Sequence, residues 1–236
     1  MAKEYFDFRQ FRIRHDRCGQ KVGTDGVLLG AWAPVEGARR ILDIGTGSGL
    51  LALMVAQRVP GAQVTGLDVD AETVVQAQEN VARSPFSERI RVLLSDVRDY
   101  AESYQGERYG HIVCNPPFYT AQTLPPDARR AVARNASGLP FGELVGCAAR
   151  LLETEGVFSV VLPTDCQPEF TRLCAVSGLH PVRLCLVQTV ARKAAKRCLI
   201  SYARRLEEWP QKENLILQDG QERSEGYKRL TREFYL

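Results

Sequence analysis

Histidine is scarce in this 236-residue sequence, and its cysteines are scattered. There are three histidines and seven cysteines, with no C-x-x-C pair: His15, His111, His180, Cys18, Cys114, Cys147, Cys166, Cys174, Cys185 and Cys198. Zinc sites usually show a characteristic ligand spacing, so we expect no metal site. An odd number of dispersed cysteines is typical of small buried side chains in a reducing compartment.

Long apolar runs are also lacking. No stretch approaches the roughly 18 apolar residues expected of a membrane span, and the start Met1-Ala2-Lys3-Glu4 has no apolar signal region. Low-complexity segments and internal repeats are not visible. We therefore expect a cytoplasmic protein with one α/β domain, which a chain of this length suits.

A glycine-rich loop, Gly45-Thr46-Gly47-Ser48-Gly49, lies between an apolar run at 40–42 that ends in Asp43-Ile44 and a predicted helix at 50–56. Glycines allow a loop to adopt positive φ and to pass close to a ligand. The G-x-G-x-G spacing differs from the G-x-G-x-x-G of dinucleotide folds, in which a pyrophosphate sits on the helix N-terminus. The loop therefore favours a ligand without a pyrophosphate.

Acidic residues end the next two predicted strands. Strand 63–68 ends at Asp68, about twenty residues after the glycine loop, where nucleotide-binding folds bind ribose hydroxyls. Asp70 competes for this role, but its place before the predicted helix 71–82 favours an N-cap. Strand 90–94 is followed by Asp96, which we expect to accept a hydrogen bond from the exocyclic amine of an adenine. The carboxyl ends of parallel strands meet at one edge, so these acids are predicted to face one site.

The tetrapeptide Asn115-Pro116-Pro117-Phe118 follows a further apolar run at 111–114. Asn-Pro is also an ordinary turn starter, so the tetrapeptide alone would indicate only a turn. Its place at the same sheet edge as the glycine loop instead favours a site that holds a planar amine between fixed acceptors and an aromatic face. Strand alternation predicts that Cys114 points away from Asn115 into the core.

These motifs resemble those of Rossmann-like methyltransferases that use S-adenosyl-L-methionine (AdoMet). The tetrapeptide resembles the subgroup that methylates amino groups of adenine, guanine or glutamine. The segments FRIRHDRC (11–18) and KVGTDGVLLGAW (21–32) further resemble the bacterial tRNA1(Val) adenine N6-methyltransferases, which modify the adenosine just 3′ of the anticodon. The match covers most of the chain and is strongest over 8–119. It implies AdoMet as cofactor, a tRNA anticodon loop as substrate and N6-methyladenosine as product.

The resemblance also implies the fold: α/β, with a seven-stranded, mostly parallel sheet, an antiparallel last strand and helices on both faces. The pattern of the second half predicts helices at 137–152 and 166–177 and strands at 156–162, 182–188 and 198–203. We expect a single methyltransferase domain over 1–236. Within it, 1–35 would cover the cofactor, 36–206 would form the core sheet and 207–236 a C-terminal extension.

Ten residues are predicted to bind the cofactor: Lys21, Thr24, Asp25, Asp43, Gly45, Gly47, Gly49, Asp68, Asp96 and Asn115. By resemblance, residues 21–25 would fold over the methionine end of AdoMet. Capping preference alone predicts instead that Thr24 or Asp25 caps the following helix, with Trp32 in the core. Both interpretations stay open.

The net charge of +3 comes from the second half of the chain, because the first 120 residues carry nearly equal numbers of basic and acidic side chains. The stretch 183–205 holds seven basic residues and no acid, which is typical either of a solvated loop or of an RNA-binding surface. Beside an amine-binding motif we favour RNA contacts. The predicted contacts are Arg192, Lys193, Lys196 and Arg197, then Arg129, Arg130 and Arg134, then Arg9, Arg12, Arg14 and Arg17.

The predicted catalytic residues are Asn115, Pro116, Pro117 and Phe118. The Asn115 side-chain carbonyl and the Pro116 backbone carbonyl would accept from the amine, and Phe118 would stack on the base. A base in a single-stranded loop is accessible without flipping from a duplex, so we favour RNA over double-stranded DNA. The sequence does not indicate which tRNA is chosen or whether the protein oligomerises.

Three other functions fit parts of the pattern. A ribosomal RNA guanine-N2 methyltransferase would use the same tetrapeptide. A release-factor glutamine N5-methyltransferase would usually have tyrosine at the position of Phe118 and a helical N-terminal domain. A non-catalytic RNA-binding scaffold is disfavoured by the intact glycine loop with Asp43 and Asn115.

Overall fold

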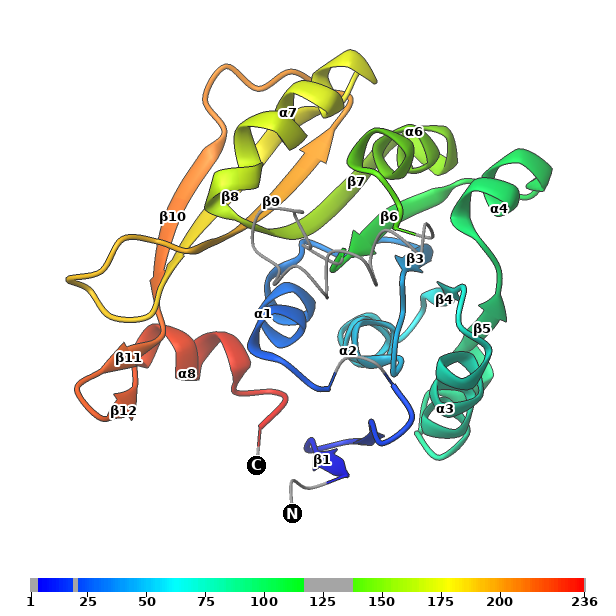
Figure 1. The fold of residues 1–236 in the computed structure, drawn as a ribbon, viewed down its shortest axis with the longest axis horizontal. Coiled ribbons are helices and arrows are strands. Elements are labelled where there is room, and N and C mark those ends of the chain that lie inside the picture. Colours follow the sequence, from blue (N-terminus) through cyan, green and yellow to red (C-terminus); the bar gives the residue numbers. More distant parts are fainter. Residues whose placement is uncertain (1–3, 19–20, 117–137, 236) are drawn as a thin grey trace, which may run out of the picture.

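A single eight-stranded sheet with helices on both faces forms the centre of the molecule (Figure 1). The structure, a computed structural model, describes residues 4–18, 21–116 and 138–235. The strands of the main sheet are β3 (Arg40–Ile44), β4 (Gln63–Asp68), β5 (Ile90–Leu94), β6 (Tyr109–Cys114), β7 (Leu152–Pro163), β8 (His180–Gln188), β9 (Arg197–Ala203) and β10 (Gln211–Ile216).

The strand order is β10-β8-β9-β7-β6-β3-β4-β5, and only β9 runs antiparallel to its neighbours within this sheet. Strands β3 to β9 thus form the predicted seven-stranded, mostly parallel sheet with an antiparallel last strand, and the predicted fold class is confirmed. An eighth strand, β10, pairs in parallel with β8. It comes from the segment predicted as a C-terminal extension, so part of that segment widens the sheet.

Helices cover each face of the sheet because the strands bury apolar side chains in both directions. Ile41 and Val113 pack into one core cluster, and their neighbours Leu42 and Ile112 pack into the other. The first cluster includes residues of α1 (Thr24–Trp32), α2 (Leu50–Arg58), α3 (Ala71–Ala82) and α8 (Glu225–Thr231). The second includes residues of α4 (Val97–Ser103), α6 (Phe141–Leu151) and α7 (Gln167–Val176).

Local sequence patterns predicted most of these elements. The helix at 71–82 and the strand at 90–94 have the predicted bounds, whereas α4 was not predicted. This helix spans seven residues and buries only Val97 and Ala101, which is too short for a helical period to be recognised. Cys114 is buried in the core as predicted, and burial raises the pKa of its thiol.

The two ends of the chain lie side by side (Figure 1). Strands β1 (Tyr5–Asp7) and β2 (Arg12–Arg14) form a small hairpin, and a second one joins β11 (Gln218–Asp219) to β12 (Glu222–Arg223). Phe8 stacks on Tyr235 with ring centroids 6.0 Å apart, and the backbone N–H of Arg9 donates to the carbonyl of Phe234. In the described part of the chain, no helix has the length and apolar character needed to cross a membrane.

Candidate active site

The glycine loop connects β3 to α2 at the carboxyl edge of the sheet. Gly45, Gly47 and Gly49 have φ of 70°, 55° and 83°, a region that side chains rarely adopt. A Cβ added at Gly45 or Gly47 would meet nothing within 4 Å. The backbone of the loop therefore borders open space on this side, as a cradle for a ligand requires.

Gly66, in β4, lies beneath the loop and was not singled out in the sequence. A Cβ added there would lie 2.8 Å from Thr46 Oγ1 and 3.0 Å from Thr46 Cβ. The backbone N–H of Thr46 also donates to the carbonyl of Leu67 at 2.8 Å. Glycine at this position thus lets the loop pack directly on the neighbouring strand. An isolated glycine inside a strand pattern is the signal that indicates such an approach.

Asp43 is fully buried below the loop. Its Oδ2 accepts from Thr46 Oγ1 at 2.7 Å and from the backbone N–H of Ala52 at 3.1 Å. Its Oδ1 is buried and has no hydrogen-bond partner among the described residues. Burial raises the pKa of this carboxyl from 3.8 to about 7, against the opposite effect of its two hydrogen bonds. A buried carboxyl group with one oxygen that lacks a partner among the described residues suits a cationic ligand.

Asp68 and Asp70 have separate roles, and the sequence predicted that of Asp70. The side chain of Asp70 accepts from the backbone N–H of Thr73 and caps α3, which confirms its prediction as an N-cap. Asp68 is half-buried, and its Oδ2 accepts from the backbone N–H of Gly47 at 2.9 Å. It therefore fixes the glycine loop; its contact with a ribose stays a prediction.

Asp96 lies at the end of the neighbouring strand and caps the unpredicted helix α4. Its Oδ1 accepts from the backbone N–H of Arg98, and both carboxylate oxygens accept from the Arg98 guanidinium. The side-chain bond to Arg98 lowers the pKa of Asp96. A contact of Asp96 with adenine stays a prediction, and it would use oxygens that are already bound to Arg98.

Asn115 follows β6 directly and is half-buried at the same edge. A Cβ added at Gly26 of α1 would lie 3.9 Å from Asn115 Nδ2, so the first turns of α1 lie beside this side chain. Pro116 is buried. Pro117 and Phe118, like Arg129, Arg130 and Arg134, lie outside the described residues.

The N-cap of α1 is Gly23, without a side-chain hydrogen bond, so the prediction that Thr24 or Asp25 caps this helix was wrong. Both lie in the first turn instead, where an acid is favourable because it faces the positive end of the helix dipole. Asp25 forms an ion pair with Arg197 at 2.9 Å. This contact joins the segment predicted to cover the cofactor to the start of β9. Lys21 is exposed just before it.

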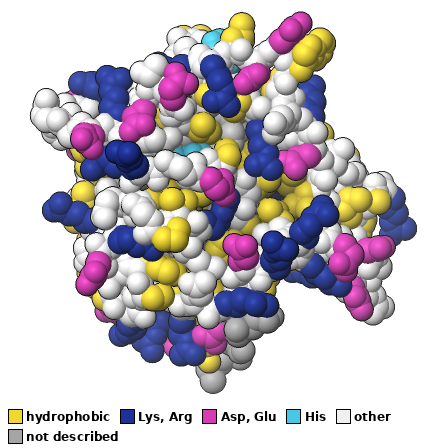
Figure 2. Space-filling model, turned by 180° about the vertical axis from the view of Figure 1, so that it is seen from behind, with side chains coloured by type: hydrophobic (Ala, Val, Ile, Leu, Met, Phe, Trp, Pro, Cys, Tyr) yellow, Lys and Arg dark blue, Asp and Glu magenta, His cyan; other side chains and the backbone are white. Residues whose placement is uncertain are grey.

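Within the described residues, the basic side chains predicted to bind RNA fall into two groups. Arg192, Lys193 and Lys196 are exposed in the loop between β8 and β9, at the carboxyl edge of the sheet. In the N-terminal segment, by contrast, Arg12 and Arg17 form ion pairs with Asp7 and Glu79. Figure 2 likewise shows Lys and Arg interspersed with Asp and Glu over one face of the molecule. The β8–β9 loop is therefore the better candidate for RNA contacts.

Histidine has a structural role in the sheet. His111 is buried in β6, and its Nε2 lies 3.0 Å from Ser159 Oγ, which in turn lies 2.7 Å from Ser201 Oγ. Burial lowers the pKa of His111 to about 3, so the ring is neutral near pH 7. This row of side chains links β6, β7 and β9.

The fold and this edge define a class of protein: a Rossmann-like, AdoMet-dependent methyltransferase. Residues 22–170 match the model of the methyltransferase small domain. The whole chain is 44% identical to the tRNA1(Val) (adenine(37)-N6)-methyltransferase of Bacteroides fragilis strain YCH46, and the match covers 100% of this chain and 99% of the relative. The enzymes of that name from Aeromonas hydrophila (43% identity; 98% and 97% covered) and Escherichia coli O157:H7 (42%; 100% and 96%) are also similar. The chain belongs to the tRNA1(Val) (adenine(37)-N6)-methyltransferase family.

Solved structures share the fold at lower identity. A predicted O-methyltransferase from Agrobacterium tumefaciens has a TM-score of 0.70 at 22% identity, with 89% of this chain and 96% of that chain covered. The 16S rRNA N2 methyltransferase RsmC of T. thermophilus, solved with AdoMet and guanosine, has a TM-score of 0.58 at 22% identity, with 85% and 50% covered.

Proposed function

We propose that this protein transfers a methyl group from AdoMet to the exocyclic N6 of the adenosine next to the anticodon in a tRNA. The observation that supports this most directly is the placement of Asn115 at the edge that holds the glycine loop and Asp43, in a chain 42–44% identical to enzymes named for this reaction. The products are N6-methyladenosine and S-adenosylhomocysteine.

The residues present fit AdoMet. The glycine loop leaves open space at Gly45 and Gly47, and the buried Oδ1 of Asp43 lacks a partner among the described residues. When bound, AdoMet supplies an electrophilic methyl group on a cationic sulfur. We propose that Asp43 favours the cofactor's positive charge and that Asp68, Asp96 and residues 21–25 contact the rest of it.

Asn115 would orient the acceptor amine. The N6 lone pair of adenine is delocalised into the ring, so the amine needs both hydrogens held by acceptors while its lone pair faces the methyl group. The side-chain carbonyl of Asn115 and the backbone carbonyl of Pro116 are acceptors at adjacent positions. Orientation and electrostatics of this kind lower the barrier without a side chain that titrates near neutrality. The proton lost from N6 would pass to water.

The basic loop between β8 and β9 would bind the RNA. Arg192, Lys193 and Lys196 are exposed near the start of β9, whose Arg197 contacts Asp25 of α1. Phosphates of an anticodon loop bound there would bring an unpaired base to the edge that carries Asn115. Because tRNA is the substrate, we propose that the protein is located in the cytoplasm. We also propose one catalytic domain over 1–236, since a single main sheet forms its centre.

The proposal is tested with tRNA from a strain that lacks the modification. Nucleoside mass spectrometry after incubation with AdoMet should detect N6-methyladenosine at the anticodon-adjacent position. N2-methylguanosine in its place would contradict the choice of base. If neither nucleoside gains a methyl group, the proposed function is wrong.

Asn115→Ala should reduce kcat by at least about a hundredfold, a typical cost of losing one polar contact at the reacting centre, while AdoMet binding by calorimetry is retained. Asn214→Ala, an exposed asparagine on β10, serves as the control and should methylate tRNA like the unmodified protein. Full activity of Asn115→Ala would rule out its role in orienting the amine.

A further inference from the structure

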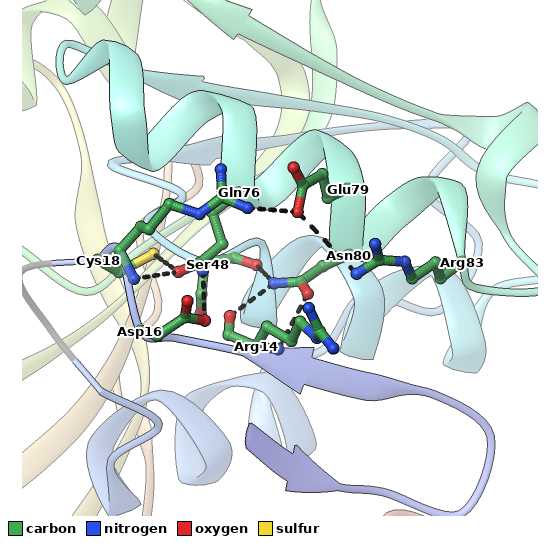
Figure 3. A network of polar contacts seen from close by, with 9 residues as sticks. Arg14, Asp16, Cys18, Ser48, Gln76, Glu79, Asn80 and Arg83 are labelled. Atoms are coloured by element: carbon green, nitrogen blue, oxygen red, sulfur yellow. Dashed lines mark hydrogen bonds and ion pairs between the residues drawn. The ribbon is translucent and has the colours of Figure 1, made fainter. Parts of the chain in front are cut away.

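Helix α3 holds the N-terminal segment through side chains that the proposed chemistry does not use. Residues 14–18 run past α3, and Figure 3 shows Arg14, Asp16 and Cys18 beside Gln76 and Asn80. The segment continues toward α1, whose first turns lie beside Asn115. Anything that fixes residues 14–18 therefore also limits the movement of the stretch proposed to cover the cofactor.

Asn80 makes the central contacts of this network. Its Oδ1 accepts from the backbone N–H of Arg14 at 2.9 Å, and its Nδ2 donates to the Arg14 carbonyl at 2.8 Å. The same Nδ2 donates to the carbonyl of Ser48 at 2.9 Å. Asn80 is only 2% exposed. A single buried amide thus pairs with both backbone groups of Arg14, as a neighbouring strand would, and also holds the glycine loop.

The contact with Ser48 holds the glycine loop between two of its positive-φ residues. Ser48 stands between Gly47 and Gly49, which both have positive φ. The N–H of Gly47 is bound by Asp68, and the carbonyl of Ser48 is bound by Asn80. Two side chains from different elements therefore hold the peptide units on either side of the Gly47–Ser48 peptide, in the shape that leaves the cradle open.

Gln76 lies one helical turn before Asn80 and also binds the N-terminal segment to α3. Its Oε1 accepts from the backbone N–H of Arg17 at 3.1 Å and from Cys18 Sγ at 2.9 Å, and its Nε2 donates to Asp16 Oδ1 at 2.8 Å. Gln76 is fully buried, whereas the Arg17–Glu79 pair outside it is partly exposed. Fully satisfied buried polar groups specify one arrangement, because breaking any contact leaves a group without a partner.

We infer that Asn80 is a positioning residue that couples the N-terminal segment to the glycine loop, so that the loop and the segment covering the cofactor are held in one arrangement before AdoMet binds. Loss of Asn80 releases both at once, and AdoMet then has to order them on binding. The inference rests on the proposed use of AdoMet but not on which base is methylated.

The test replaces Asn80 by Asp and by Ser. Asp keeps an acceptor for the Arg14 N–H but places a carboxylate against two carbonyls; Ser removes most of the contacts without adding charge. We expect AdoMet to bind at least about tenfold more weakly by calorimetry, because its binding must then order the loop and the segment that Asn80 otherwise holds. At saturating AdoMet, kcat and the KM for tRNA should stay within about threefold, because those steps begin from the ordered state.

A second measurement needs neither cofactor nor RNA. Hydrogen exchange of the free protein should become faster at the amides of residues 14–18 and 45–50 in both variants, and stay unchanged in β6 and β7. Gln78→Ala is the control. It lies on the same helix, but its Nε2 donates to the carbonyl of Val92 at 3.0 Å, away from the N-terminal segment.

Three results would overturn the inference: an unchanged affinity for AdoMet, faster exchange over the whole fold, or an equal loss in Gln78→Ala. If Asn80→Asp does not fold, Asn80→Ser decides the question alone. A failure of the proposed function is distinguishable, because it would show in the unmodified protein as missing methylation while the affinities for AdoMet remain measurable.

Discussion

The two halves of the sheet's carboxyl edge are built in different ways. At β3 and β4, the acids Asp43 and Asp68 accept hydrogen bonds from the glycine loop and from the first turn of α2, and these bonds hold the loop against the sheet. At β8 and β9, the residues Arg192, Lys193 and Lys196 are exposed. The first half is shaped for one small molecule. The second half presents exposed positive charge, which suits the phosphates of a large RNA. Such phosphate contacts position the RNA, but they do not select the base.

The ion pair between Asp25 and Arg197 connects the two halves. It joins the first turn of α1, within the segment predicted to cover the cofactor, to the strand that follows the basic loop. Substitutions at β3 and β4 should therefore alter AdoMet binding and leave RNA binding largely unchanged, and substitutions in the β8–β9 loop should do the reverse. The exception in that comparison is this ion pair, which links the two halves.

The largest effect is expected at Asp43. Asp43→Asn should weaken AdoMet binding by at least about a hundredfold, since a buried charge partner of a cation contributes several kcal/mol. Binding to the unmodified protein should tighten as the pH rises through about 7, where Asp43 ionises, and level off above. Calorimetry between pH 6 and pH 8.5 measures both. An affinity that does not change with pH would contradict the role of Asp43.

The same substitution should stabilise the free protein at alkaline pH. Because burial raises the pKa of Asp43 from 3.8 to about 7, the folded state binds a proton more tightly than the unfolded state. Ionised Asp43 thus costs stability above about pH 7, by up to about 4 kcal/mol at 1.36 kcal/mol per pKa unit, and this cost fades as the pH falls toward 4. The Asp43→Asn variant should therefore unfold at a higher urea concentration than the unmodified protein at pH 8. The difference between the two midpoints should be smaller at pH 5.

Asp99→Asn is the matched control for both measurements. Asp99 is an exposed acid on α4 and lies outside the proposed site. Its substitution should change neither AdoMet binding nor the pH dependence of unfolding. Equal stabilisation of the two variants at pH 8 would assign the effect to net charge rather than to burial.

The next effect belongs to the other half of the edge. Replacing Arg192, Lys193 and Lys196 by Ala should weaken tRNA binding about 10- to 100-fold at 0.1 M salt and lower the salt slope by about 2, at about 0.7 per phosphate contact for single strands. Filter binding across a salt series measures both, and AdoMet affinity should be unchanged.

Arg39, Arg108 and Arg172 form a control set of equal charge. All three are exposed, and Arg39 and Arg108 precede β3 and β6 at the opposite edge of the sheet. Their replacement by Ala should alter the salt slope little. Equal losses in both triple variants would show that RNA responds to total charge and that the β8–β9 loop has no special role.

The sequence predicted the first half of the edge better than the second. Gly45, Gly47, Gly49 and the strand-ending acids form a local pattern with a physical reason at each position. The predicted cap of α1 was wrong because Gly23, Thr24 and Asp25 are all plausible caps, and the local pattern cannot show that Asp25 pairs with a residue 172 positions away. Asn80 and Gln76 carry no local signal, since a polar residue on a helix usually faces solvent.

The smallest effect tests the packing under the glycine loop. Gly66→Ala places a Cβ 2.8 Å from Thr46 Oγ1, so Thr46 must turn and weaken its bond to Asp43. We expect a loss of about 1 to 3 kcal/mol in unfolding free energy, the range for overpacking, and weaker AdoMet binding by several-fold. Tyrosine and tryptophan fluorescence in urea measures the first effect.

A double-mutant cycle with Thr46→Ala separates crowding from other effects of the new methyl group. Thr46→Ala removes Oγ1 and Cγ2, two of the three atoms that the added Cβ would approach, and keeps only Cβ at 3.0 Å, so Gly66→Ala should cost less in that background than alone. Equal costs in both backgrounds would mean that Gly66 is not needed for the loop to pack on β4. In either case tRNA binding should stay unchanged, because the β8–β9 loop lies at the other half of the edge.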